Sequence, residues 1–150
     1  MQTVESVAEM CELAQEWRSS NKTVALVPTM GALHKGHGRL IAKAEQLADI
    51  VVVSSFVNPL QFNDKSDLVN YPKTEDADKA ICEKLGVHCY FSPTSEDFYP
   101  KGFLTYVKVC HFSNIIEGAS RPGHFRGVTT VVAKLFNIVQ PSHAVFGHKD

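Results

Sequence analysis

The chain has 150 residues, 44% of them hydrophobic, and its formal net charge is −1 with histidine neutral. This length and apolar content suffice for one buried core, so we expect a single domain. The balanced charge argues against a nucleic-acid surface, the longest apolar run is too short to span a membrane, and the first five residues lack the pattern of a signal peptide.

Apolar patterns predict alternating helices and strands in the first half of the chain. A first helix, with Thr3 as its candidate N-cap, is predicted by the helical spacing of Val4, Val7, Cys11, Ala14 and Trp17. The patterns then predict, in chain order, a buried strand at 23–27, a loop rich in Gly and His at 28–38, a helix over 40–48 and a continuous apolar strand at 50–57.

The second half continues this alternation. Its patterns predict, in order, a polar loop at 58–72, a helix from Thr74 to Gly86, a strand at 87–91, a loop at 92–102, a strand at 104–109, a short helix and turn at 115–122, a long helix at 125–139 and a short strand at 144–146. Such alternation predicts an α/β fold with a mostly parallel sheet, helices on both faces and right-handed crossovers.

Three loops stand out because each directly follows a predicted strand. They span residues 28–38, 58–62 and 147–150. Ligands bind parallel sheets beyond the carboxyl ends of the strands, so we expect these loops to share one rim and one site.

The four cysteines, Cys11, Cys82, Cys89 and Cys110, form no C-x-x-C pair, and each sits among apolar neighbours. We expect reduced thiols in the core of a cytoplasmic protein rather than disulfides or a zinc site.

The segment Pro28-Thr29-Met30-Gly31-Ala32-Leu33-His34-Lys35-Gly36-His37 combines glycines with two imidazoles at a predicted helix start. His34 and His37 share one helix face, and the helix dipole and the free N–H groups of the first turn favour anions. Gly31 and Gly36 let the backbone approach a phosphate closely. The pattern indicates a triphosphate site, although a glycine-rich turn with two surface histidines also fits it. A zinc pair would need a third ligand, and none is evident at a useful spacing.

A second segment, Phe56-Val57-Asn58-Pro59-Leu60-Gln61-Phe62, carries two neutral amides just past a buried strand. The side chains of Asn58 and Gln61 can hold a hydroxyl or a carboxylate without adding charge. A turn in which Asn precedes Pro for backbone reasons explains the same composition.

Charged side chains gather in two further segments, at 120–127 and 146–150. Arg121, His124 and Arg126 lie near the start of the long helix, where anion contact, helix capping and surface salt bridges all fit. Near the end of the chain, Lys149 can contact a phosphate, and Asp150 can contact a ribose hydroxyl or Mg²⁺. Two residues by themselves are weak evidence for a binding site.

Together these motifs resemble the pantothenate synthetase (pantoate–β-alanine ligase) family. The likeness runs from about Val27 to Asp150 and includes PTMGALHKGH at 28–37, FVNPLQF at 56–62, YPKT at 71–74 and EGASRPGHFRGVTTVVAKLFNIVQP at 117–141. The H-x-G-H element alone is typical of the wider nucleotidyltransferase group, which includes class I aminoacyl-tRNA synthetases. The NPxQF and SRPGHFRG elements narrow the likeness to this family.

The resemblance implies a Rossmann-like nucleotidyltransferase fold and a two-step reaction. ATP and pantoate would give pantoyl adenylate and pyrophosphate, and β-alanine would then attack to give pantothenate and AMP. Mg²⁺, a homodimer and a cytoplasmic location are also implied. Neither a nucleic acid nor a membrane is expected as a partner.

Residue by residue, the resemblance assigns to ATP the positions Met30, Gly31, Ala32, Leu33, His34, Lys35, Gly36, His37, Gly147, His148, Lys149 and Asp150. It assigns to pantoate and β-alanine the positions Gln61, Asn58 and Met30. His37 matches the residue usually assigned as proton donor, and His34 and Lys149 complete the catalytic candidates.

Two departures from the family matter. His148 stands where the family commonly has Glu, which changes the local charge but leaves Lys149 and Asp150 in place. Complete members are close to twice this length, and they continue with a glutamine that contacts pantoate and a C-terminal domain whose serine- and arginine-containing loop closes over the phosphates. We therefore expect residues 1–150 to be the N-terminal nucleotide-binding domain, and the chain to be a fragment.

Two other functions compete with the ligase. In the first alternative, the half-chain by itself only binds nucleotide or dimerises, without turnover. Alternatively, the chain is a different nucleotidyltransferase that shares only the H-x-G-H element.

Overall fold

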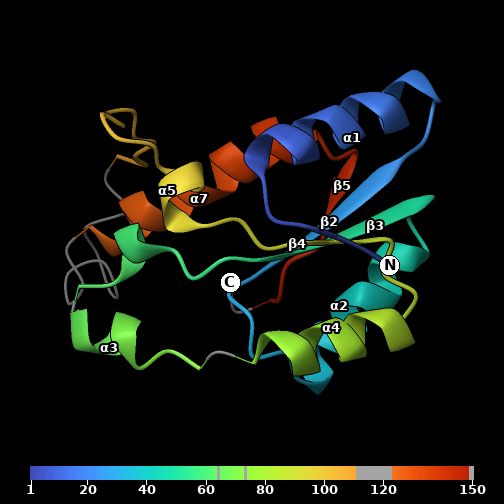
Figure 1. The fold of residues 1–150 in the computed structure, drawn as a ribbon, viewed down its shortest axis with the longest axis horizontal. Coiled ribbons are helices and arrows are strands. Elements are labelled where there is room, and N and C mark those ends of the chain that lie inside the picture. Colours follow the sequence, from blue (N-terminus) through green and yellow to red (C-terminus); the bar gives the residue numbers. More distant parts are fainter. Residues whose placement is uncertain (64, 73, 111–122, 149–150) are drawn as a thin grey trace.

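The computed structural model describes residues 1–63, 65–72, 74–110 and 123–148, and its centre is a parallel β-sheet (Figure 1). Five strands lie in the order β1-β4-β3-β2-β5, and each neighbouring pair is parallel. They are β1 (Gln2–Val4), β2 (Val24–Thr29), β3 (Ile50–Ser55), β4 (Cys89–Phe91) and β5 (His143–Ala144). The predicted α/β fold with a parallel sheet is confirmed.

Helices cover both faces of this sheet (Figure 1). One face carries α1 (Val7–Ser19), α5 (Ser95–Phe98) and α7 (His124–Val139), and the other carries α2 (Lys35–Glu45) and α4 (Glu75–Lys84). Thr74 directly precedes α4, as the sequence predicts.

The central strands contribute to two separate cores. Leu26 and Val52 pack in one core with residues of α1 and α7, whereas Val27 and Val53 pack in the other with residues of α2 and α4. Because neighbouring residues of a strand face opposite sides, a strand covered on both faces is apolar at every position. This burial explains the continuous apolar runs that identify β2 and β3 in the sequence.

The structure corrects the predicted start of the chain. Residues 2–4 form β1 beside β4, so Thr3 is not the N-cap of the first helix. α1 begins instead after Ser6, whose side chain accepts a hydrogen bond from the backbone N–H of Glu9 at 3.4 Å. Val4 was predicted to lie in the helix because its spacing from Val7 is helical, but it is fully buried in the sheet.

Two predicted loops contain short helices. η1 (Pro59–Gln61) and α3 (Lys65–Val69) lie between β3 and α4, and α5 lies within 92–102. The side chains of Asn58 and Thr94 cap η1 and α5 by accepting backbone N–H groups of Leu60 and Asp97. Elements of three to five residues are too short to show a periodic pattern.

The predicted strand at 104–109 is wrong. This segment lies against α7, where the N–H of Val107 donates to the Thr130 hydroxyl at 3.1 Å and the Val107 carbonyl accepts from Thr129 at 2.6 Å. No strand of the described ranges pairs with it. The last strand covers 143–144 rather than 144–146, and the prediction for 115–122 lies outside the described residues.

The four cysteines, all within the described ranges, are free thiols as predicted, but one of them is not in the core. Cys82 and Cys89 are buried, and burial raises the pKa of each thiol to about 12, so both remain protonated at neutral pH. Cys110 is exposed because the segment that leads to it does not join the sheet.

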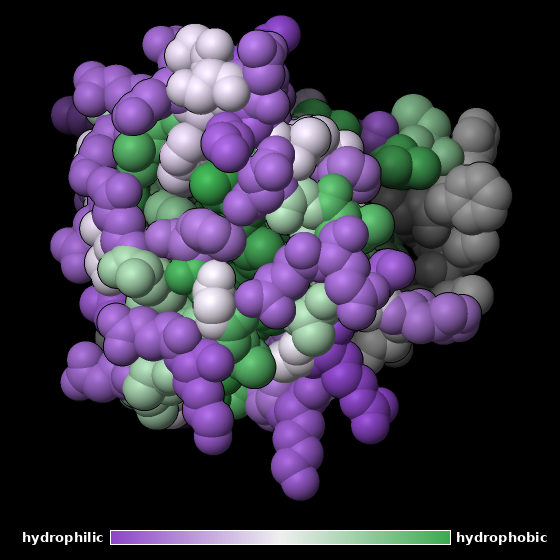
Figure 2. All heavy atoms as spheres, turned by 90° about the vertical axis from the view of Figure 1, so that its right-hand side faces the viewer, coloured by the Kyte–Doolittle hydropathy of each residue, from purple (hydrophilic) through white to green (hydrophobic). Residues whose placement is uncertain are grey.

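The surface at the end of the molecule where α1 leads into β2 is mainly polar. Figure 2 shows hydrophilic side chains over most of this face, with smaller hydrophobic areas between them. Among the helices of the described ranges, none has both the length and the apolar character needed to span a bilayer.

Gly127 of α7 packs directly against the backbone of η1. A β-carbon at this position would collide with the carbonyl group of Leu60 and would lie 2.7 Å from the backbone nitrogen of Gln61. Both neighbours are main-chain atoms, so a side chain at 127 cannot be accommodated by a change of rotamer. The glycine therefore sets how closely α7 approaches the loop that carries Asn58 and Gln61.

We predict that Gly127→Ala lowers the free energy of unfolding by about 1–3 kcal/mol, the usual cost of overpacking, and displaces η1. Gly38→Ala in α2 is the matched control, because its added β-carbon makes only an ordinary 3.5 Å contact with Leu85. Alanine is the better helix former by about 1 kcal/mol, so the control should match or exceed the wild-type stability. Equal stabilities of the two variants in urea unfolding would contradict this prediction.

Candidate functional site

The loops after β2 and β3 meet at the rim formed by the carboxyl ends of the parallel strands. β2 and β3 pair in register over six residues, from Val24 with Ile50 to Thr29 with Ser55. Beyond this pairing, the side-chain amide nitrogen of Gln61 lies 3.1 Å from the sulfur of Met30. The first and second sequence clusters are therefore in direct contact.

The two imidazoles of the first cluster cap helix α2. Nδ1 of His34, the N-cap, accepts the backbone N–H of Gly36 at 3.0 Å, and Nδ1 of His37 accepts the backbone N–H of His34 at 3.3 Å. The ring centroids lie 4.1 Å apart. This is the reciprocal arrangement of a capping box, made here by two histidines.

Capping fixes which ring nitrogen carries the proton. A neutral imidazole that accepts at Nδ1 must carry its hydrogen on Nε2. His34 and His37 are thus both Nε2–H tautomers, which suits the donation of hydrogen bonds to an anion. Gly36 is required by this cap, because a β-carbon there would lie 2.7 Å from Cε1 of His34.

The expected supply of free backbone N–H groups is largely used within the chain. The N–H of Gly31 donates to the Thr29 hydroxyl at 3.1 Å, and those of Ala32 and Leu33 donate to the two carboxylate oxygens of Asp78 at 2.9 and 2.7 Å. The N–H groups of His34 and Gly36 are taken by the imidazoles. The backbone N–H groups of residues 31–34 and Gly36 are therefore already committed to hydrogen bonds within the chain.

Asp78 is a buried support of the first loop that the sequence motifs do not reveal. Its side chain is 2% exposed, and it also accepts the hydroxyl of Thr74 at 3.1 Å. Gly31 and Ala32 both have positive φ, +83° and +51°, and for alanine this conformation is strained. Asp78 stabilises this turn by accepting hydrogen bonds from the backbone N–H groups of Ala32 and Leu33. The available signal was a carboxylate one turn before buried Cys82, on the apolar face of α4.

The second cluster forms a compact network of amides. Asn58, which is 1% exposed, donates through its side-chain nitrogen to Oε1 of Gln61 at 2.9 Å and to the Gly127 carbonyl at 3.1 Å. Its oxygen accepts the N–H of Leu60 at 3.2 Å and the hydroxyl of Tyr99 at 2.9 Å. Asn58 is therefore a buried support of Gln61.

The third cluster adjoins the second. Nδ1 of His124 lies 2.8 Å from the backbone carbonyl of Gln61, which can only accept, so the ring donates from Nδ1. The guanidinium of Arg126 lies over the ring of Tyr106, 4.7 Å from its centroid. Arg121 lies outside the described residues. The described part of this cluster thus stabilises η1 and the 103–109 segment.

A cavity of about 410 Å³ opens beside the two contacting loops, and its walls include Met30, Gly31, Ser55, Asp78 and Ser92. The imidazoles and Gln61 are not among its lining residues.

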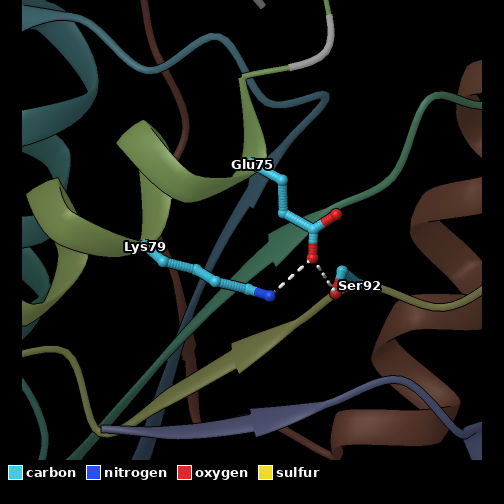
Figure 3. Close-up of polar contacts among 3 residues, drawn as sticks. All are labelled: Glu75, Lys79 and Ser92. Atoms are coloured by element: carbon cyan, nitrogen blue, oxygen red, sulfur yellow. Dashed lines mark hydrogen bonds and ion pairs between the residues drawn. The ribbon is translucent and has the colours of Figure 1, made fainter.

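One wall of this cavity is held by a polar contact between α4 and the end of β4. The carboxylate of Glu75 accepts from Nζ of Lys79 at 2.7 Å and from the Ser92 hydroxyl at 3.4 Å (Figure 3). The hydrogen bond to Glu75 raises the pKa of the Lys79 ammonium, which is therefore charged at neutral pH. Both partners are partly exposed, so the pair contributes little to stability.

The fourth cluster is described only in part. Gly147 and His148 follow β5, which pairs with β2, while Lys149 and Asp150 lie outside the described residues. Within the described ranges, no group of three or more His, Cys, Asp or Glu side chains is arranged to hold a metal ion.

Comparison with known proteins gives a consistent result. The family model described as pantoate-beta-alanine ligase matches residues 2–150. The pantothenate synthetase of Nitrosococcus oceani is 54% identical over 152 residues, which cover 100% of this chain and 53% of that relative. A crystal structure of pantothenate synthetase from Thermus thermophilus superposes with a TM-score of 0.89 at 45% identity, covering 98% of this chain and 52% of that one.

A second solved structure is that of the pantoate-beta-alanine ligase of Francisella tularensis, in complex with beta-gamma ATP and β-alanine. It has a TM-score of 0.90 and 40% identity, and the match covers 96% of this chain and 55% of that one. The chain spans about half the length of the curated relatives it matches. Because the family model covers nearly every residue, the chain belongs to the pantoate–β-alanine ligase family.

Proposed function

We propose that residues 1–150 are the N-terminal, nucleotide-binding domain of an enzyme that condenses pantoate with β-alanine at the expense of ATP. The reaction proceeds through pantoyl adenylate and releases pyrophosphate and AMP. The 3.1 Å contact between Gln61 and Met30 carries the proposal, because it joins the segment assigned to ATP with the amide assigned to pantoate. The Francisella tularensis relative, complexed with beta-gamma ATP and β-alanine, supports the substrate classes.

The chemistry requires activation of a carboxylate. A carboxylate is a poor acyl electrophile because its oxygen leaves badly, and adenylation supplies a good leaving group. The obstacle is the approach of two anions, since two unit charges about 4 Å apart repel by about 1 kcal/mol in water and about 4 kcal/mol at a partly buried site. Hydrogen-bond donors near the phosphates offset this repulsion.

We assign that task to His34 and His37. Each ring accepts a backbone N–H at Nδ1, so each neutral imidazole carries its hydrogen on Nε2. His37 donates to the phosphate region as pyrophosphate departs, and Lys149 adds positive charge. Both reactants must also be aligned in one cleft, and this alignment contributes as much as proton transfer does. Mg²⁺ remains an expectation from the family resemblance.

The proposed location is the cytoplasm. Four free thiols are compatible with a reducing compartment.

A homodimer is the proposed assembly, with residues 104–109 in its interface. Leu104 is 84% exposed, and Tyr106, Val107 and Val109 are each more than 40% exposed. The segment is mainly apolar, and no strand of the described ranges pairs with it. An exposed apolar segment of this kind is typical of an interface with a second chain.

We predict that His37→Ala in the full-length protein lowers the rate of pyrophosphate release from ATP and pantoate by 10²–10⁴-fold, the usual contribution of a general acid or base. His143→Ala, at the exposed start of edge strand β5, is the control and should keep the wild-type rate. A loss of less than about tenfold in the His37 variant would show that the assigned role is wrong.

We predict that Asp78→Asn weakens ATP binding and lowers the free energy of unfolding by about 1–3 kcal/mol, because an amide has only one acceptor oxygen for the N–H groups of Ala32 and Leu33. The matched control is Asp76→Asn, an exposed position in the same helical turn. Calorimetric titration of ATP and thermal unfolding measure the two effects. Identical behaviour of both variants would contradict the role of Asp78.

We predict that the full-length protein is dimeric in light scattering and that Leu104→Asp shifts it toward the monomer, since a buried charge destabilises an apolar interface. Val69→Asp on α3 is the control, because Val69 is also highly exposed, at 75%, but lies outside the 104–109 segment. A Leu104→Asp variant that stays fully dimeric at low micromolar concentration places the interface elsewhere.

A further inference from the structure

The side-chain amide of Asn58 has only one orientation that satisfies its neighbours. The Gly127 carbonyl can only accept a hydrogen bond, so the Asn58 nitrogen must face it at 3.1 Å. The backbone N–H of Leu60 can only donate, so the Asn58 oxygen must face that group at 3.2 Å. One main-chain acceptor and one main-chain donor thereby fix the orientation of the Asn58 amide.

The orientation of Asn58 determines that of Gln61. The Asn58 nitrogen donates to Gln61 at 2.9 Å, so the atom it meets must be the oxygen Oε1. Nε2 of Gln61 then points toward Met30, whose sulfur is a weak acceptor. Gln61 thus presents N–H groups to the rim, and such donors suit a stronger acceptor than a thioether, such as a carboxylate or hydroxyl oxygen.

Tyr99 provides the second hydrogen bond to the Asn58 oxygen. Its hydroxyl donates to Oδ1 of Asn58 at 2.9 Å. Burial raises the pKa of this phenol well above its usual value, so it stays protonated and remains a donor at neutral pH.

The ring of Tyr99 is itself held in place. It contacts the rings of Phe98 and Phe103 at centroid distances of 5.0 and 4.9 Å. The ammonium of Lys134 on α7 lies 5.5 Å from its centroid and also lies over both neighbouring rings. The hydroxyl therefore has little freedom to leave Asn58.

We propose that Tyr99 is a positioning residue, which fixes Gln61 through Asn58 as a hydrogen-bond donor to the acid substrate. This inference rests on the proposed function, because it names the residue that prepares the same site for an oxygen acceptor. Tyr99 acts through two intervening amides, so its hydroxyl has no direct contact with substrate.

The test is Tyr99→Phe in the full-length protein, with pantoate as the varied substrate and ATP and β-alanine saturating. We expect the KM for pantoate to rise about three- to tenfold, the effect of one neutral hydrogen bond, and the KM for ATP to stay unchanged. Tyr106→Phe is the matched control, because Tyr106 lies in the same aromatic group, against Phe103, and its hydroxyl plays no part in the amide network. In a Gln61→Ala background, Tyr99→Phe should have no further effect on the KM, since the two residues act as one unit.

A KM for pantoate within twofold of wild type in Tyr99→Phe would overturn the proposal, as would an equal rise in both backgrounds. A second measurement is independent of turnover. The side-chain NH₂ signals of Asn58 and Gln61 in NMR spectra should shift in Tyr99→Phe and remain in place in Tyr106→Phe, and unmoved signals in Tyr99→Phe would also overturn it. A wild-type protein that releases no pyrophosphate from ATP and pantoate contradicts the proposed function alone, and the NH₂ signals then still decide the role of Tyr99.

Discussion

The parallel pairing of β2 with β3 is the constraint on which the site depends. It places the ends of both strands at one edge, so that the loops that begin at Met30 and Asn58 leave the sheet side by side. Their contact between Met30 and Gln61 follows from this geometry. In an antiparallel pair the two loops would leave the sheet at opposite ends of the strands, and the two clusters would not meet.

Much of the fold could be predicted from the sequence, because burial on both faces leaves a strong pattern. The apolar runs of β2 and β3 and the stripe of α7 identify the central elements. β1 and α5 escaped prediction because three or four residues show no period. The 104–109 segment was wrongly predicted to be a strand, because its composition suits a strand but no strand in the described part of the chain pairs with it.

At the site, the motifs identified two loops that meet, at Met30 and Gln61, but not the contacts that support them. Gly36 was predicted to let a phosphate approach the backbone, and the structure shows in addition that this glycine makes room for the His34 ring. Asn58 was predicted to contact a substrate, and the structure shows in addition that its buried side chain donates to Gln61. Sequence analysis assigned no role to Asp78, because only the tertiary structure brings it to Ala32 and Leu33. Hydrogen bonds between segments 45 residues apart leave no local pattern.

The reciprocal cap of α2 has a consequence for the entropy of ligand binding. A histidine on a mobile surface turn loses rotameric freedom when it engages a ligand, and that loss opposes binding. His34 and His37 are already fixed by their bonds to the backbone, so folding has largely immobilised both rings before any ligand arrives. For the anion contact proposed above, the helix start would thus supply a preorganised pair of donors, and little conformational entropy would be lost on binding.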